Sequence, residues 1–307
     1  MIVLNKLREL TLSAPTAVGR PSHLSAASGL VRVASFLYIV ADDELHLGVF
    51  NTDDTNPGHL IRLFDGDLPD GPRKRRKHKP DLEALTQLPA SADHPHGALL
   101  VLGSGSRPNR RTGAMLTLDA NGAMQGAPRQ IDLAPLFAPL DDAFAEPNIE
   151  GAVVIGGELR LFQRGNKAQT ENAIVRFPLL AVLDSLMSGQ DVTIMTSGID
   201  RLDLGAIDGI PLCFTDAAAL PNGDMVFTTV AEDTDDAYND GPCAGSAVGV
   251  VGNNGRLLGM YPLDRQHKVE GVAARMDGDV IRLLLVTDAD DATIPAGLFG
   301  AEVEISR

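Results

Sequence analysis

Acidic side chains recur along this sequence in front of small residues and short apolar stretches. In four places an Asp or Glu precedes Gly or Ala, and a serine takes the corresponding place in a fifth. The acidic residues are Glu83, Glu150, Asp216 and Glu270, and the serine is Ser28. Carboxylate oxygens ligate hard cations such as Ca²⁺ and Mg²⁺, and carboxyl groups act as acids and bases in hydrolysis. If the fold brings these residues together, they predict a polar site for that chemistry.

Positive side chains accompany the carboxylates. Lys79 and Lys268 lie shortly before Glu83 and Glu270, and Arg164 follows Glu150 by one predicted strand. Crowded carboxylates repel one another and raise some of their own pKa values, so nearby cations or a bound ion must offset the charge. We therefore predict a Ca²⁺ or Mg²⁺ site at Glu83, Glu150, Asp216 and Glu270. The predicted catalytic residues are Glu150, Glu270, Arg164 and Lys268, whose cations would stabilise negative charge developing on a substrate.

A second set of polar residues lies in loops that follow predicted strands. The segments Gly-Ser-Gly-Ser-Arg at 103–107 and Gln-Arg-Gly-Asn at 163–166 are more specialised than ordinary turns. Neither matches a phosphate-binding loop or a nucleophile elbow. The predicted ligand-binding residues are Lys79, Ser104, Ser106, Gln163, Asn166 and Asp288.

The elements that must position these side chains form an internal repeat. From Ser28 the five anchor residues are spaced by 55, 67, 66 and 54 residues, and the two terminal stretches together contribute 65 more. Each anchor begins one short strand, and a second apolar strand follows, over residues 36–40, 98–102, 158–162, 224–230 and 280–286. Such a period predicts an all-β chain built as a five-bladed β-propeller. The first strand of each blade lines the channel, which would bring the anchors together at one rim.

The two ends of the chain complete one blade. Only three strands are expected after residue 268, and residues 7–12 can supply the fourth. Pairing of the terminal strands would close the ring and remove exposed sheet edges. We expect residues 1–307 to form one propeller domain, with a six-bladed ring containing one degenerate blade as the alternative.

Composition restricts the partners. The chain has 26 Lys and Arg against 41 Asp and Glu, a net charge of −15. The one basic run, residues 73–79, lacks interleaved aromatic residues for base stacking, so we interpret it as a solvated loop and expect no nucleic-acid binding. No apolar run can span a membrane and no secretion signal begins the chain. Two cysteines, Cys213 and Cys243, are interpreted as reduced thiols, and a cytoplasmic location is expected.

Several of these segments also resemble a known group of proteins. They are residues 79–85, 102–106, 148–151, 163–166 and 268–271. They resemble an uncharacterised family of bacterial β-propeller proteins over nearly the whole chain. That family is distantly similar to esterase-like phytase domains and to calcium-binding propellers of the gluconolactonase type. The resemblance implies oxygen-ligated metal and hydrolysis, although those distant relatives commonly have six blades.

Two functions remain open from the sequence. The first is a metal-assisted hydrolase or lactonase that acts on a small polar molecule in a carboxylate-lined central pocket. The alternative is a propeller without catalytic activity that binds a small ligand or serves as a scaffold for a protein partner. Turnover of a substrate distinguishes the first from the second.

Overall fold

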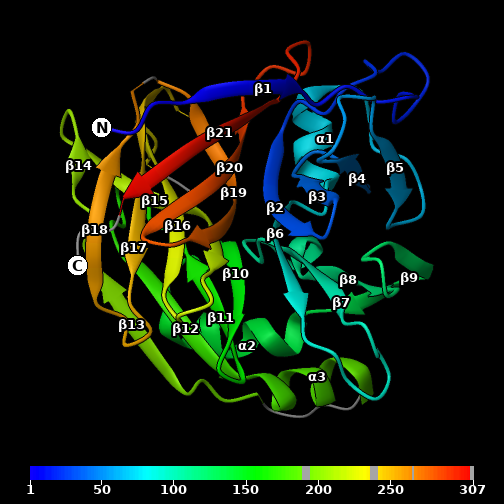
Figure 1. The fold of residues 1–307 in the computed structure, drawn as a ribbon. Coiled ribbons are helices and arrows are strands. Elements are labelled where there is room, and N and C mark those ends of the chain that lie inside the picture. The colour runs from blue at the N-terminus through cyan, green and yellow to red at the C-terminus, as the bar shows by residue number, and fades with distance from the viewer. Residues whose placement is uncertain (189–193, 236–240, 265, 305–307) are drawn as a thin grey trace.

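The strands form five antiparallel sheets arranged around a central axis (Figure 1). The computed structural model describes residues 1–188, 194–235, 241–264 and 266–304. Four of the sheets are meanders in which strands adjacent in the chain are also adjacent in space, and the fifth adds a strand from the N-terminal end to three consecutive strands from the C-terminal end. The five-bladed β-propeller predicted from the repeat is confirmed, and the six-bladed alternative is wrong.

We number the blades in chain order. Blade 1 contains β2 (Ala27–Val33), β3 (Phe36–Ala41), β4 (His46–Asn51) and β5 (His59–Arg62). Blade 2 contains β6 (Leu82–Leu88), β7 (Ala98–Gly103), β8 (Thr112–Leu118) and β9 (Met124–Asp132). Blade 3 contains β10 (Ile149–Ile155), β11 (Glu158–Gln163), β12 (Asn172–Pro178) and β13 (Gly198–Leu202). Blade 4 contains β14 (Ala206–Ile207), β15 (Ile210–Ala219), β16 (Met225–Glu232), β17 (Cys243–Val251) and β18 (Leu257–Pro262). Blade 5 contains β19 (Lys268–Asp277), β20 (Val280–Asp288), β21 (Gly297–Glu304) and β1 (Asn5–Glu9).

The terminal strands close the ring as expected. β1 pairs antiparallel with β21, with Lys6 opposite Phe299 and Glu9 opposite Gly297. This strand begins two residues before the predicted segment 7–12 and ends at Glu9. Leu10 and Leu12 come after it and are buried in the apolar cluster between blades 5 and 1. The Leu10 N–H donates to the Ala296 carbonyl, just before β21. The N-terminal segment therefore joins blade 5 to blade 1.

Apolar packing between neighbouring blades holds the ring together. The buried apolar residues divide into five clusters, and each cluster combines side chains from two adjacent blades. Between blades 3 and 4, for example, Phe162, Phe214 and Phe227 meet edge to face. Because both faces of each sheet are covered in this way, every residue of β7 and of β16 is buried, and β7 is apolar on both faces.

Three helices lie between strands in the described part of the chain: α1 (Pro72–His78), α2 (Ala134–Ala143) and α3 (Leu179–Ser188). α2 and α3 pack Phe137 and Val182 into the cluster between blades 2 and 3. α1 corrects one interpretation, because the basic run is a helix and not a solvated loop. Arg75 is buried there against Asp43 and Glu44, since a buried arginine needs carboxylate partners. None of the helices among the described residues is long and apolar enough to cross a membrane.

Candidate functional site

Bulges at the start of the inner strands direct three glutamates toward one end of the channel. The register of β6 with β7 shifts between Leu82 and Ala84, that of β10 with β11 between Ile149 and Gly151, and that of β19 with β20 between Val269 and Gly271. The residues inside these shifts are Glu83, Glu150 and Glu270. A bulge leaves its extra residue outside the ladder and turns its side chain, so the same local distortion presents each carboxylate at the same rim.

Blade 4 differs from this pattern by one residue. Its register shift lies between Phe214 and Asp216, so Thr215 and not Asp216 occupies the bulge. Thr215 donates through its hydroxyl to the Val269 carbonyl at 2.8 Å. Asp216 falls one position later and does not line the pocket that contains the three glutamates. The prediction that Asp216 shares a metal site with them is therefore not supported by its position.

Asp216 instead forms part of the floor of that pocket. Its Oδ2 atom accepts hydrogen bonds from the backbone N–H of Leu30 at 3.2 Å and of Val272 at 2.8 Å, on blades 1 and 5. Small residues make such close approach possible. A Cβ atom at Gly151 would lie 2.9 Å from the Ala217 nitrogen, and one at Gly271 would lie 2.0 Å from the Ser28 carbonyl oxygen. The inner strands are thus in tight contact at this level of the channel.

Above this floor lies a small and strongly charged pocket. Its cavity volume is about 70 Å³, room for a hydrated ion or a few water molecules. Seven carboxyl groups and five cationic side chains line it, so the acidic groups outnumber the cationic ones. The carboxylates belong to Asp42, Asp81, Glu83, Glu150, Glu232, Glu270 and Asp288, and the cations to Arg76, Lys79, Arg110, Arg164 and Lys268.

One side of the pocket is built by blades 1 and 2. The Lys79 ammonium contacts the carboxylates of both Asp42 and Asp81. Arg110 donates to the other oxygen of Asp81 at 2.6 Å, and the Ser104 hydroxyl donates to that oxygen at 2.5 Å. Burial alone would raise the pKa of Asp81, but Lys79 and Arg110 hold it below its ordinary value. Asp81 is therefore kept as a buried anion.

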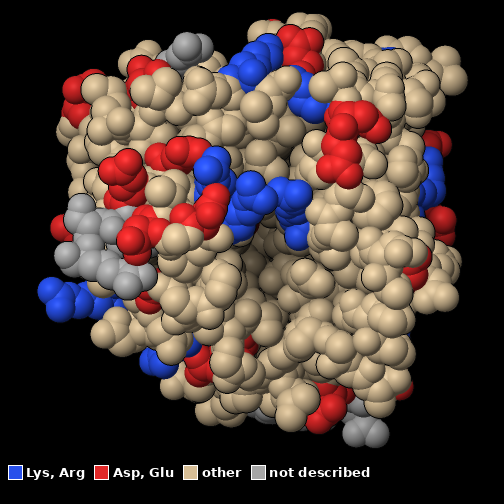
Figure 2. Space-filling model, in the orientation of Figure 1, with Lys and Arg blue, Asp and Glu red and all other residues tan. Residues whose placement is uncertain are grey.

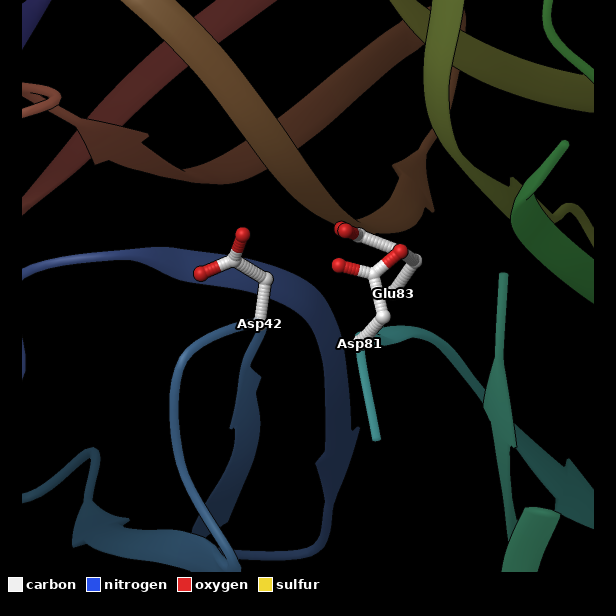
Figure 3. Close-up of side chains that lie close together, drawn as sticks. All are labelled: Asp42, Asp81 and Glu83. Carbon is white, nitrogen blue, oxygen red and sulfur yellow. The ribbon is translucent and has the colours of Figure 1, made fainter. Parts of the chain in front are cut away.

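Glu83 completes a cluster of three carboxylates on this side. One oxygen from each of Asp42, Asp81 and Glu83 lies within 4.8 Å of the others, and the three groups point toward a common space (Figure 3). Oxygen ligands 2.3–2.6 Å from one Ca²⁺ lie about this far apart, so the cluster has the donors and spacing to hold a metal ion. No hydrogen bond or ion pair joins Glu83 to any described residue. Burial, together with Glu150, Asp81 and Asp42, raises its pKa well above the ordinary value.

The opposite side is a chain of ion pairs from blades 3, 4 and 5. Arg164 joins Glu150 at 3.2 Å to Glu232 at 2.6 Å. Lys268 then lies 3.3 Å from the second oxygen of Glu232 and 3.7 Å from Glu270. Asn148 donates a further hydrogen bond of 2.6 Å to Glu150. These contacts hold Arg164 and Lys268 at the pocket surface.

Glu270 is the least satisfied group on this side. Its Oε1 atom is buried, and among the described residues it makes no hydrogen bond. Burial raises the pKa of Glu270 well above its ordinary value, although Lys268 and Arg164 oppose that shift. The raised pKa favours the protonated form of Glu270, which is the form that a general acid requires.

The structure brings together eight of the residues predicted for the site. Lys79, Glu83, Glu150, Arg164, Asn166, Lys268, Glu270 and Asp288 all line the pocket. Ser104, Ser106 and Gln163 do not. Ser104 is fully buried behind Asp81, and Ser106 bonds to Ser104 and Arg110. Gln163 bonds to the backbone of Asn148, Glu146 and Arg164, so it supports the loop that carries Arg164.

The sequence interpretation missed Asp81 and Arg110 as pocket residues, and it placed Asp42 and Glu232 among the polar residues that follow the second strands without predicting them as site residues. Asp42 directly follows β3, the second strand of blade 1, and Glu232 is the last residue of β16 in blade 4. The charged residues at every second position of Lys79-Pro-Asp81-Leu-Glu83 were a usable signal for a polar rim, although the chain is not regularly extended there, because Asp81 adopts a φ of 58°. Cys213 also lines the pocket, and both it and Cys243 are free thiols.

Comparison with known protein families shows to which family the chain belongs. Residues 23–303 match a family of unknown function, DUF6929. The chain belongs to the DUF6929 family. The matched range includes all the carboxylates and cations of the pocket. Among curated proteins no match was found.

Solved structures match this DUF6929 chain at low sequence identity. A glutaminyl cyclase from Myxococcus xanthus has a TM-score of 0.50 and 11% identity, covering 99% of this chain and 98% of that one. A luciferin-regenerating enzyme has a TM-score of 0.46 and 11% identity, covering 100% and 96%. A putative glycoside hydrolase from Parabacteroides distasonis has a TM-score of 0.47 and 10% identity, covering 96% and 92%. At these identities the likeness concerns the fold alone.

Proposed function

We propose that the charged pocket binds a divalent cation, Ca²⁺ or Mg²⁺, and that the protein is a metal-assisted hydrolase or lactonase acting on a small polar substrate. The observation that carries the proposal is the cluster of Asp42, Asp81 and Glu83, which lies beside a separate row of acid–base groups in the same pocket. A bound cation would also offset the mutual repulsion of these carboxyl groups, which contributes to the raised pKa of Glu83.

The two sides of the pocket would have different roles. A cation at the three carboxylates would activate water and polarise a carbonyl oxygen. Across the pocket, Glu270 or Glu150 would supply a proton to the leaving oxygen, and Arg164 and Lys268 would stabilise the negative charge of the intermediate. The cavity of about 70 Å³ admits only the reacting group, so the remainder of the substrate would lie outside the rim.

Lys79 gives the metal part of this proposal a sharp test. Its ammonium group already contacts Asp42 and Asp81, so a bound cation must compete with it. After treatment with EDTA, Ca²⁺ and Mg²⁺ would be titrated while thermal unfolding and heat of binding are followed. We expect one of these ions to stabilise the wild type, Glu83→Gln to abolish the effect, and Lys79→Gln to increase the affinity. Glu304→Gln, an exposed residue on β21, is the matched control.

The catalytic part is tested with a panel of lactones and aryl esters. We expect Glu270→Gln and Arg164→Gln to lower turnover by at least about 100-fold, in line with typical contributions of a general acid or an oxyanion-stabilising group. Full activity of Glu270→Gln on a substrate that the wild type hydrolyses would exclude its role.

The small cavity favours one alternative function. A pocket that holds little more than a hydrated ion also suits cation binding without turnover. In that case the ion would be recovered in a 1:1 complex, Glu83→Gln would still abolish binding, and no member of the substrate panel would be converted.

A further inference from the structure

The channel has a second opening, on the far side of the floor that Asp216 helps to form. Its walls come from residues 30–32, 85–90, 152–154, 217–219 and 272–274, with His96 beside them, and we call this cavity the funnel. All five inner strands contribute to it. The funnel has a cavity volume of about 350 Å³, five times that of the charged pocket and within the range of small-molecule sites.

The floor lies between the funnel and the charged pocket, and the two cavities have different lining residues. No residue lines both the funnel and the charged pocket. Between them the inner strands are in backbone contact, as the distances at Gly151 and Gly271 show, and Asp216 links blades 1 and 5. A ligand in the funnel would therefore occupy a site distinct from the proposed metal site.

The funnel lacks the excess of acidic residues that the chain has as a whole. Among its described lining residues, none is acidic, and the two that can carry charge are Arg32 and His96. This is unusual in a chain with 41 acidic and 26 basic residues. Most of the remaining lining consists of Leu, Val, Ala and Pro side chains, including Leu30, Leu85 and Val154.

The positive charge continues beyond the funnel along one edge. Arg32 also lines a neighbouring hollow of about 320 Å³, together with Arg275 and Arg282. Arg282 is held by Asp277 at 2.9 Å and Glu302 at 2.6 Å, whereas no described residue forms an ion pair or hydrogen bond with the Arg275 side chain. Figure 2 shows a hollow near the place where β2, β6 and β10 converge in Figure 1, with Lys and Arg side chains above it and Asp and Glu side chains beside them.

We propose that the funnel binds a small monocarboxylate with an apolar body, its chain against the inner-strand aliphatic residues and its carboxylate at Arg32. The apolar walls favour burial of a hydrocarbon chain, and arginine binds a carboxylate with two parallel hydrogen bonds. Exposed Arg275 adds a second positive charge next to the opening. The absence of acidic residues from the described lining removes the repulsion that an anion meets elsewhere on this protein.

Octanoate is the probe for a first test by isothermal titration calorimetry, with octanol and octylamine as ligands of similar length but different charge. We expect octanoate to bind the wild type in a 1:1 complex and octanol and octylamine to bind at least about tenfold more weakly, since an ionic hydrogen bond is worth roughly this factor. No binding of octanoate at millimolar concentration, or equal binding of octanol, would overturn the proposal.

Variants locate the site. Arg32→Gln should weaken octanoate binding about tenfold, as expected from loss of an ionic hydrogen bond. Ala218→Phe should block the funnel, with folding checked by circular dichroism. Arg282→Gln, whose guanidinium is already held by two carboxylates, should bind as the wild type does. Glu83→Gln should also leave octanoate binding unchanged, which separates this inference from the proposed function. Wild-type affinity in Arg32→Gln, or a loss in Glu83→Gln equal to that in Arg32→Gln, would contradict it.

Discussion

The Oδ2 atom of Asp216 accepts a hydrogen bond of 2.8 Å from the backbone N–H of Val272 on the adjoining blade. The same oxygen accepts another bond from the Leu30 N–H at 3.2 Å. A single side chain thus accepts hydrogen bonds from backbone N–H groups on the inner strands of two other blades. It does so at the level where these strands close the channel. This position explains why an acidic residue is buried there with no cationic partner among the described residues.

We predict that Asp216→Ala destabilises the protein by about 3 kcal/mol, because two buried N–H groups lose their acceptor. Asp216→Asn should cost less, since its amide oxygen can accept the same bonds. Urea unfolding measures both. A loss below about 0.5 kcal/mol in Asp216→Ala would show that this link is unimportant.

The protonation of Asp216 predicts a pH dependence. Burial raises its pKa well above the ordinary value of 3.8, against the effect of its backbone hydrogen bonds. The folded state therefore holds the proton more tightly than the unfolded state. That contribution to stability is complete below pH 3.8 and is lost as the pH rises toward the folded-state pKa. The wild type should accordingly lose stability relative to Asp216→Asn as the pH rises from 4 to 8. An invariant difference between the two unfolding curves would contradict this.

We predict that Arg164→Met lowers the free energy of unfolding by about 3–5 kcal/mol, because it leaves buried Glu150 and Glu232 without their shared cation. Arg201→Met is the control, since its ion pair with Glu171 is exposed and should contribute less than about 1 kcal/mol. Chemical unfolding at low and high salt distinguishes the two. Equal losses of unfolding free energy in both variants would show that the buried ion pairs of Arg164 contribute no more to stability than an exposed ion pair does.

Closure of the ring predicts a contrast between two leucines near the N-terminus. Leu10 is fully buried between blades 5 and 1, whereas Leu7 on β1 is 51% exposed. Leu10→Ala should cost about 2–5 kcal/mol through lost burial and the cavity left behind. Leu7→Ala should cost less than about 1 kcal/mol. Comparable losses in thermal unfolding would mean that the segment after β1 does not join the blades.

Close contact at the channel axis predicts that Gly271 tolerates no side chain. An added Cβ would lie 2.0 Å from the backbone oxygen of Ser28, and neither strand can move without separating blades 1 and 5. Gly271→Ala should destabilise by at least about 3 kcal/mol. At Gly300 on β21, the atoms nearest to an added Cβ belong to the Leu7 side chain and lie at 3.5 Å or more, so Gly300→Ala should change stability by less than about 0.5 kcal/mol. Near-equal melting temperatures for the two variants would be inconsistent with this packing.

The amino-acid sequence alone favoured five blades over six and predicted that the two ends of the chain close the ring. The spacing of the anchor residues, and the strand missing after Lys268, left room for five units and required β1 to pair with β21. It also identified Glu83, Glu150 and Glu270 as residues that converge, because a repeated position in a radial array returns to the same rim. These features follow from periodicity and chain length, which are properties of the sequence itself.

Only the tertiary structure decided which neighbouring positions face the pocket. A bulge at Thr215 instead of Asp216 moves the acidic side chain to the floor, because a shift of one residue along a strand reverses its direction. Asp81 and Arg110 came into contact for a different reason. Their ion pair joins a strand entry to a loop 29 residues away, and that distance depends on how blade 2 is packed. A local sequence pattern does not predict which residues far apart in the chain come into contact, because those contacts depend on how the blades pack in the closed ring.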